Sequence, residues 1–177
     1  YGPASKVYVG ASAREALAKS EMPGCDVLHF ATHGLLDDGN PMYSHIVLSR
    51  DEANRDEDGL LEAREIMALD LTARIAVLSA CETARGGISP GEGVIGMSWS
   101  FFVAGCPTTV VSQWRVNSAS TSQLMIEFHR NLLSGSSRVR PRWWKADALR
   151  NAMLTLLKTP KYKEPYYWAG FVVVGAG

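Results

Sequence analysis

The sequence predicts a single α/β domain with a mostly parallel sheet and helices on both faces. Two apolar runs, one from Asp26 to Ala31 and one from Arg74 to Cys81, lack the polar alternation of half-exposed strands. Such runs are typical of buried parallel strands. Segments of helical periodicity lie between the runs, and strands that alternate with helices favour parallel pairing. With 177 residues and 46% hydrophobic content, the chain can bury one sizeable core.

The first half of the chain alternates between short strands and helices, with one strongly charged loop. β-Branched and apolar clusters predict the strands, and a small hydroxyl residue before an apolar periodic segment predicts a helix start. The expected elements are a strand at 6–9, a helix at 12–19 with Ser12 as N-cap, a strand at 26–31, a strand at 45–49, a solvated charged loop at 51–59 and a helix at 62–69.

The second half continues the same alternation. The expected elements are the strand that ends at Cys81, a glycine-rich loop at 85–93, a helix through Ala104 with Gly105 as its C′ residue, a strand at 108–114, a helix at 118–133 capped by Ser118, a helix at 145–158 and a strand at 171–174. Leu124, Phe128 and Leu132 have the spacing of a buried helical stripe. The whole pattern predicts a sheet of about six strands.

Composition argues against several classes of partner. Eighteen basic and eighteen acidic residues cancel, so no global charge favours nucleic acid or a membrane surface. The three cysteines, Cys25, Cys81 and Cys106, are odd in number and scattered, which indicates a reducing, cytoplasmic location rather than a disulfide framework. No metal and no cofactor are expected. The start at Tyr1 has no signal-peptide pattern and suggests a fragment of a longer protein.

A histidine and a cysteine follow the two buried strands at equivalent places. His33 and Cys81 both come just after their strands, at the carboxyl edge where open α/β sheets form their sites. An imidazole beside a thiol can act as the base for that nucleophile. Gly34 allows close backbone approach, and its N–H together with that of Cys81 is a candidate oxyanion hole. The competing interpretation is that Cys81 simply packs, as buried cysteines often do.

Other arrangements of residues carry less chemistry. His29 and His33 lie about 13 Å apart along an extended strand, too far to share one metal ion, so His29 is expected to be structural. His45 and His129 are expected to be solvated or core residues. The glycines from Gly91 to Gly96 match a dinucleotide-binding pattern but lie too far from their strand and lack the following acidic residue, which indicates a loop and a helix start.

Six short motifs together resemble the CHAT domain, a family of the caspase-like cysteine peptidases that is related to caspases and separases. They occur in the family's order at residues 29–34 (HFATHG), 59–66 (GLLEAREI), 77–83 (VLSACET), 91–96 (GEGVIG), 110–114 (VVSQW) and 166–171 (YYWAGF). The resemblance implies a caspase-like three-layer sandwich over residues 1–177, with His33 as general base and acid and Cys81 as nucleophile. It also implies limited proteolysis of a partner protein, with a tetratricopeptide-repeat or sensor region upstream.

Substrate selection is expected just after the strand at 108–114. Gln113, Trp114 and Arg115 are the candidate substrate-binding residues, beside which a peptide can add as an extended strand. Similar sequences typically carry acidic residues after the tryptophan, whereas this chain has Arg115. Arg115 either favours an acidic substrate group or points to solvent. The alternative function is a non-catalytic caspase-like interaction or assembly module.

Overall fold

The strands of the computed structural model form two separate sheets. The structure describes residues 1–37, 39–51, 54, 56–79, 92–134 and 144–176, except for the side chains of 92–95. Its strands are β1 (Val27–Phe30), β2 (Gly34–Leu35), β3 (His45–Val47), β4 (Leu60–Glu62), β5 (Ile75–Leu78), β6 (Thr108–Ser112) and β7 (Phe171–Gly175). The α-helices are α1 (Glu15–Glu21), α2 (Ala63–Ile66), α3 (Glu92–Val103), α4 (Ser118–Ser134) and α5 (Trp144–Leu157). Short 3-10 turns occupy 2–4, 10–12, 22–24, 41–43, 160–162 and 165–167.

The larger sheet has the strand order β1-β5-β6-β7 and is mostly parallel. β1 pairs in parallel with β5, β5 pairs in parallel with β6, and only β7 runs antiparallel to its neighbour. The carboxyl ends of β1, β5 and β6 therefore lie at one edge of this sheet. The smaller sheet, β2-β3-β4, is antiparallel throughout.

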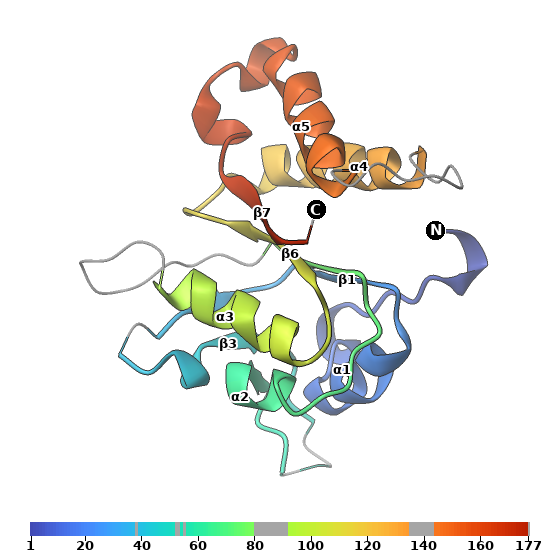
Figure 1. The fold of residues 1–177 in the computed structure, drawn as a ribbon, viewed down its shortest axis with the longest axis vertical. Helices are drawn as coiled ribbons and strands as arrows, with labels where there is room; N and C mark the ends of the chain where they lie inside the picture. The colour runs from blue at the N-terminus through green and yellow to red at the C-terminus, as the bar shows by residue number, and fades with distance from the viewer. Residues whose placement is uncertain (38, 52–53, 55, 80–91, 135–143, 177) are drawn as a thin grey trace.

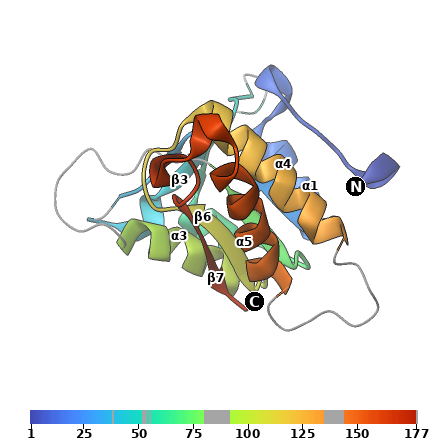
Figure 2. The same cartoon turned by 90° about the horizontal axis from the view of Figure 1, so that it is seen from above.

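Helices cover both faces of the larger sheet and make three layers (Figure 1). In β5, Ile75 and Val77 pack with α4 and α5, whereas Ala76 and Leu78 pack with residues of α2 and α3. This alternation explains the continuous apolar run, because a strand with helices on both faces has no solvent-exposed side. Figure 2 shows α4 and α5 running beside one another over the sheet, and the two helices pack together.

Local sequence signals set two helix ends. Gly105 follows α3 with φ +107°, and the Cys106 N–H donates to Phe101 O at 2.9 Å, which confirms Gly105 as the C′ residue of a Schellman-type end. The N-cap of α4 is Asn117 rather than the predicted Ser118. The Asn117 Oδ1 accepts from the Ala119 and Ser120 amides, both at 3.1 Å. An Asx side chain one residue earlier thus satisfies the free amides at the start of the helix.

The expected six-stranded sheet is not confirmed, since the larger sheet has four strands in the part of the chain that the structure describes. The segment 6–9 forms no strand: Val7 is 80% exposed and Val9 71% exposed, and β-branched residues make a strand only beside a partner. The strand expected at 45–49 exists as β3, but it pairs with β2 and β4 in the smaller sheet.

Several predicted helix starts move along the chain. Ser12 is not the N-cap of α1, because its hydroxyl bonds to Val9 O within the preceding 3-10 turn and Arg14 is the N-cap. The helix expected from Glu62 begins at Ala63, after a short strand, and Glu62 and Glu65 form its capping box. The buried stripe of Leu124, Phe128 and Leu132 on α4 is confirmed.

None of the helices in the described part of the chain is both long enough and apolar enough to cross a membrane.

Candidate functional site

The ends of β1 and β5 meet in a defined register at the edge of the larger sheet. Phe30, the last residue of β1, is the partner of Leu78, the last residue of β5. His33 follows Phe30 by three residues, and Cys81 follows Leu78 by three residues. The two candidate catalytic residues therefore follow the ends of two adjacent parallel strands by the same number of residues.

Cys81 itself lies outside the described residues, as do the oxyanion role expected for its N–H and residues 85–91 of the expected glycine-rich loop. The last two residues of that expected loop, Glu92 and Gly93, instead begin α3. The described chain on this side ends at Ser79. The Ser79 N–H and hydroxyl both donate to Phe30 O, at 3.0 Å and 3.1 Å. These bonds hold the end of β5 against the end of β1 two residues before the cysteine.

His33 has an exposed side chain on a firmly held backbone. The His33 carbonyl accepts from Val47 N–H at 2.7 Å, and the Thr32 hydroxyl donates to Val47 O at 2.6 Å. Gly34 is buried and begins β2, where it pairs with Ile46. The smaller sheet therefore fixes the chain on both sides of His33 while the residue remains exposed to solvent.

Among the described residues, no carboxylate forms a hydrogen bond or an ion pair with the His33 ring. Asp37 accepts the Gly39 and Asn40 amides through Oδ1, both at 2.9 Å, and so stabilises its own turn. Asp38 lies outside the described residues. The arrangement is compatible with a dyad, and no third member is assigned.

The three candidate substrate residues follow β6 at the same sheet edge. The Gln113 N–H donates to Gly170 O at 2.7 Å, so the pairing with the β7 side continues one residue beyond β6. Gln113 and Arg115 are exposed, whereas Trp114 is half-buried. A Cβ atom at Gly170 would lie 2.8 Å from Val116 Cγ1 and 3.2 Å from Trp114 Nε1, so the glycine makes room for the indole.

The remaining described cysteines are held in hydrogen bonds to backbone carbonyls. The Cys25 thiol donates to Glu21 O at 3.2 Å, and the Cys106 thiol donates to Thr108 O at 3.4 Å. Cys106 is fully buried, and burial raises the pKa of its thiol. Both residues are therefore suited to packing rather than to nucleophilic attack.

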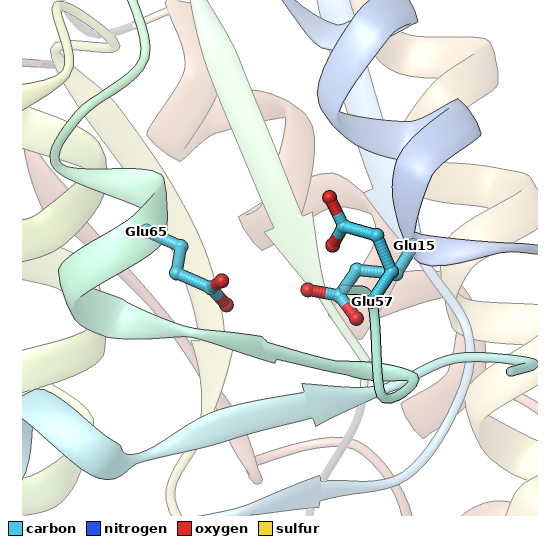
Figure 3. A group of neighbouring side chains, drawn as sticks. All are labelled: Glu15, Glu57 and Glu65. Atoms are coloured by element: carbon cyan, nitrogen blue, oxygen red, sulfur yellow. The ribbon is translucent and has the colours of Figure 1, made fainter. Parts of the chain in front are cut away.

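Three carboxylates converge between α1, the charged loop and α2. Glu15, Glu57 and Glu65 point toward one another in Figure 3, and each offers an oxygen within 4.8 Å of the others. The Lys19 ammonium group lies among them and forms ion pairs with all three. The loop predicted to be solvated thus supplies a half-buried partner, Glu57.

Burial and ion pairing act in opposite directions on the Lys19 ammonium group in this cluster. Burial works against the charged form of Lys19, but its bonds to the three carboxylates outweigh burial and raise the pKa of the ammonium group. Glu15 is 2% exposed and also accepts the Gly59 N–H at 2.8 Å. Among the described residues, this is the one group of acidic, histidine or cysteine side chains with metal-ligand spacing, and Lys19 gives it the geometry of a structural ion-pair cluster.

Sequence reasoning did not find a second polar network, which connects His29, expected to be structural, with His129. The His29 Nδ1 and His129 Nε2 atoms lie 3.0 Å apart although the residues are 100 positions apart in the chain. The available signal was the alternation in β1, which turns His29 to the same face as Val27, toward α4.

Comparisons with known proteins agree with the motifs. The CHAT domain family model matches residues 1–176. Tetratricopeptide repeat protein 28 of Mus musculus is 29% identical over 118 residues, which cover 66% of this chain and 4% of that protein. Its Homo sapiens counterpart is 25% identical over 198 residues, which cover 95% of this chain and 8% of that protein. The chain thus spans less than a tenth of these curated relatives. It belongs to the CHAT domain family, which is related to the caspase-like cysteine peptidases.

Proposed function

We propose that this chain is a cysteine endopeptidase that cuts a partner protein at limited sites, with His33 and Cys81 as its dyad. The observation that carries the proposal is the parallel register of Phe30 with Leu78, from which the two residues are equally distant along the chain. Membership of a family related to cysteine peptidases supports the same function.

The proposed reaction has two halves. The His33 imidazole takes the proton of the Cys81 thiol while the sulfur attacks the scissile carbonyl carbon, and N–H groups of Gly34 and Cys81 stabilise the oxyanion. His33 then donates that proton to the leaving amine, and a thioester remains. Water, deprotonated by His33, attacks the thioester, which releases the new carboxyl terminus and restores the thiol.

The substrate is a protein segment that binds in extended form beside residues 113–115. The Gln113 N–H already donates to Gly170 O, so backbone pairing with substrate is proposed for the residues that follow it, Trp114 and Arg115. The residues upstream of the cut select the substrate. Arg115, which stands where similar sequences have acidic residues, favours an acidic side chain among the substrate residues upstream of the cut.

The cellular setting follows from the relatives and the cysteines. Curated relatives are named for tetratricopeptide repeats, so the partner region proposed for this chain is a repeat segment of a longer protein. The described cysteines Cys25 and Cys106 are free thiols, which supports a reducing cytoplasmic location.

The test is labelling with an activity-based electrophile, followed by mapping of the adduct and by digestion of a peptide library. Wild type is expected to be labelled at Cys81 and to cleave peptides. His33→Ala is expected to lose both properties, and Cys25→Ala, the matched cysteine control, to keep both. Labelling of wild type and His33→Ala at equal rates, with no cleavage by either, would exclude the peptidase.

A second candidate function is a non-catalytic interaction module. It is favoured by Trp99 and Val103, one turn apart on α3, which are 59% and 48% exposed. Paired apolar side chains on a helix surface are typical of protein contacts. In that case Trp99→Ala would weaken binding to the repeat region while Cys81→Ala would not.

A further inference from the structure

A chain of hydrogen bonds runs from the end of β5 through two histidines to the first residue. The Ser79 Oγ lies 2.9 Å from His29 Nε2, His29 Nδ1 lies 3.0 Å from His129 Nε2, and His129 Nδ1 lies 2.7 Å from the Tyr1 hydroxyl. All four ring nitrogens of the two histidines are therefore engaged. These hydrogen bonds connect β1, α4, the residue after β5 and the N-terminal segment.

The hydrogen bonds of Ser79 set which atoms donate and which accept along the whole hydrogen-bond chain. Because the Ser79 hydroxyl donates to Phe30 O, its oxygen accepts from His29 Nε2–H. The bare His29 Nδ1 then accepts from His129 Nε2–H, and the bare His129 Nδ1 accepts from the Tyr1 hydroxyl. Both rings are neutral Nε2–H tautomers in this assignment, and every polar atom in the chain is satisfied.

Added protons affect the two rings differently. A proton on His129 Nδ1 requires only that the Tyr1 hydroxyl turn from donor to acceptor. A proton on His29 Nδ1 sets two N–H groups against each other and breaks the bond between the rings. Burial, and then the charge of His129, lower the pKa of His29 to about 4, so the intact neutral chain is the form present near neutral pH.

The surrounding charged groups leave this assignment in place. Burial also lowers the pKa of His129, with a smaller contribution from the amino group of Tyr1. The other charged groups near the chain form pairs with one another, namely Asp26 with Arg74 and Glu127 with Arg130.

The rings also connect the sheet edge to the core of the α4 layer. The His29 and His129 ring centroids are 5.0 Å apart, and Phe128, the neighbour of His129, is fully buried. A fully buried aromatic side chain anchors α4 against the sheet. His129 is therefore held in place by packing, and it passes that constraint through His29 to Ser79 and Phe30.

We propose that His29 is a positioning residue, which through Ser79 fixes the carboxyl ends of β1 and β5 from which His33 and Cys81 depart, with His129 holding it in the required tautomer. This inference rests on the proposed peptidase function for its catalytic consequence. Its structural content, the direction of the hydrogen-bond chain, is independent of that function.

The first experiment measures ring nitrogens of the intact protein by ¹⁵N–¹H NMR. Both His29 and His129 are expected as neutral Nε2–H tautomers at pH 7, with His129 titrating before His29 on acidification. An Nδ1–H tautomer on either ring at pH 7, or a His29 that titrates near the pKa of a free imidazole, overturns the inference.

The second experiment compares His29→Leu with His29→Gln, because glutamine offers a donor for Ser79 and an acceptor for His129. His29→Leu is expected to lower kcat about tenfold with KM nearly unchanged, and His29→Gln to recover most of that loss. When kcat is plotted against pH, the fall on the acid side is expected to depend on one more proton in wild type than in His29→Gln. Equal kcat values and equal acid limbs in all three proteins overturn the positioning role.

Failure of the peptidase would be recognised separately. If wild type and His33→Ala alkylate Cys81 alike and neither cleaves peptides, the proposed function fails. The positioning role is then decided by the amide resonances of Phe30 and Ser79, which are expected to shift in His29→Leu but not in the control His45→Gln. Unshifted resonances in His29→Leu overturn it.

Discussion

Phe30 and Leu78 are register partners at the carboxyl ends of two adjacent parallel strands. Ser79 donates two hydrogen bonds to the Phe30 carbonyl, which continues the contact one residue past the ladder. One main-chain and one side-chain hydrogen bond thus tie the end of β5, which leads to the candidate nucleophile, to the end of β1, which leads to the candidate base. These bonds also identify where substitutions will be informative.

Replacement of Thr32 by valine removes the hydroxyl that donates to Val47 O and leaves that carbonyl short of one donor. We expect the free energy of unfolding to fall by about 1 kcal/mol. We also expect kcat to fall by a larger fraction than the free energy of unfolding does, because the backbone before His33 is held less firmly. Urea titration and peptide cleavage measure the two effects. Thr32→Ser, which keeps the hydroxyl, serves as control and should resemble wild type in both assays. Unchanged kcat in Thr32→Val would show that this bond does not position His33.

Replacement of Lys19 by methionine leaves three neighbouring carboxylates without their cation. We expect a destabilisation of about 3 kcal/mol at pH 7, since breaking a largely buried ion-pair cluster strands charge. The loss should shrink as pH falls, because protonation of a carboxylate relieves the repulsion. Lys6→Met, which breaks the exposed pair with Glu21, should cost far less, because water screens that pair. Equal costs for the two variants would contradict the assigned role of the cluster.

Replacement of Gly105 by alanine forces a side chain into a left-handed backbone conformation. Its φ is +107°, and a Cβ there would lie 2.6 Å from Leu71 O. We expect a loss of at least about 2 kcal/mol, measured by thermal or urea unfolding. The matched control is Gly24→Ala, where the φ is not positive and no atom lies within 4 Å of an added Cβ. A neutral Gly105→Ala would mean that the turn after α3 relaxes freely.

The histidine pair should make stability depend on pH in a defined window. The pKa of His29 is about 4 in the folded protein and about 6.5 in an unfolded chain, so the unfolded state binds more protons between these values. Stability should therefore rise with pH from about 4 to 6.5 and be lost on acidification. Part of His29 is exposed to water, so the contribution is on the order of 1 kcal/mol. His29→Gln should flatten this part of the curve in urea titrations at several pH values, and an unflattened curve would assign the dependence to other groups.

Prediction succeeded where local sequence is sufficient. The runs that became β1 and β5 are apolar on both faces, which marks parallel strands covered by helices, and the Gly105 helix end follows from a preference of the glycine backbone. The segment 6–9 failed because strand propensity needs a neighbouring strand, and β3 was assigned to the wrong sheet because propensity carries no information about partners. The placement of Cys81 and its oxyanion N–H stays a prediction, and so does the peptidase activity.

By itself, the sequence determined the α/β class, the two buried strands and the motifs that assign the chain to its family, because these depend on side-chain character and short spacing. Only the tertiary structure decided that Phe30 faces Leu78, that Glu57 turns inward to Lys19, and that His29 bonds His129. Such contacts join residues dozens of positions apart. Their formation depends on how separate elements pack, and no local preference encodes that.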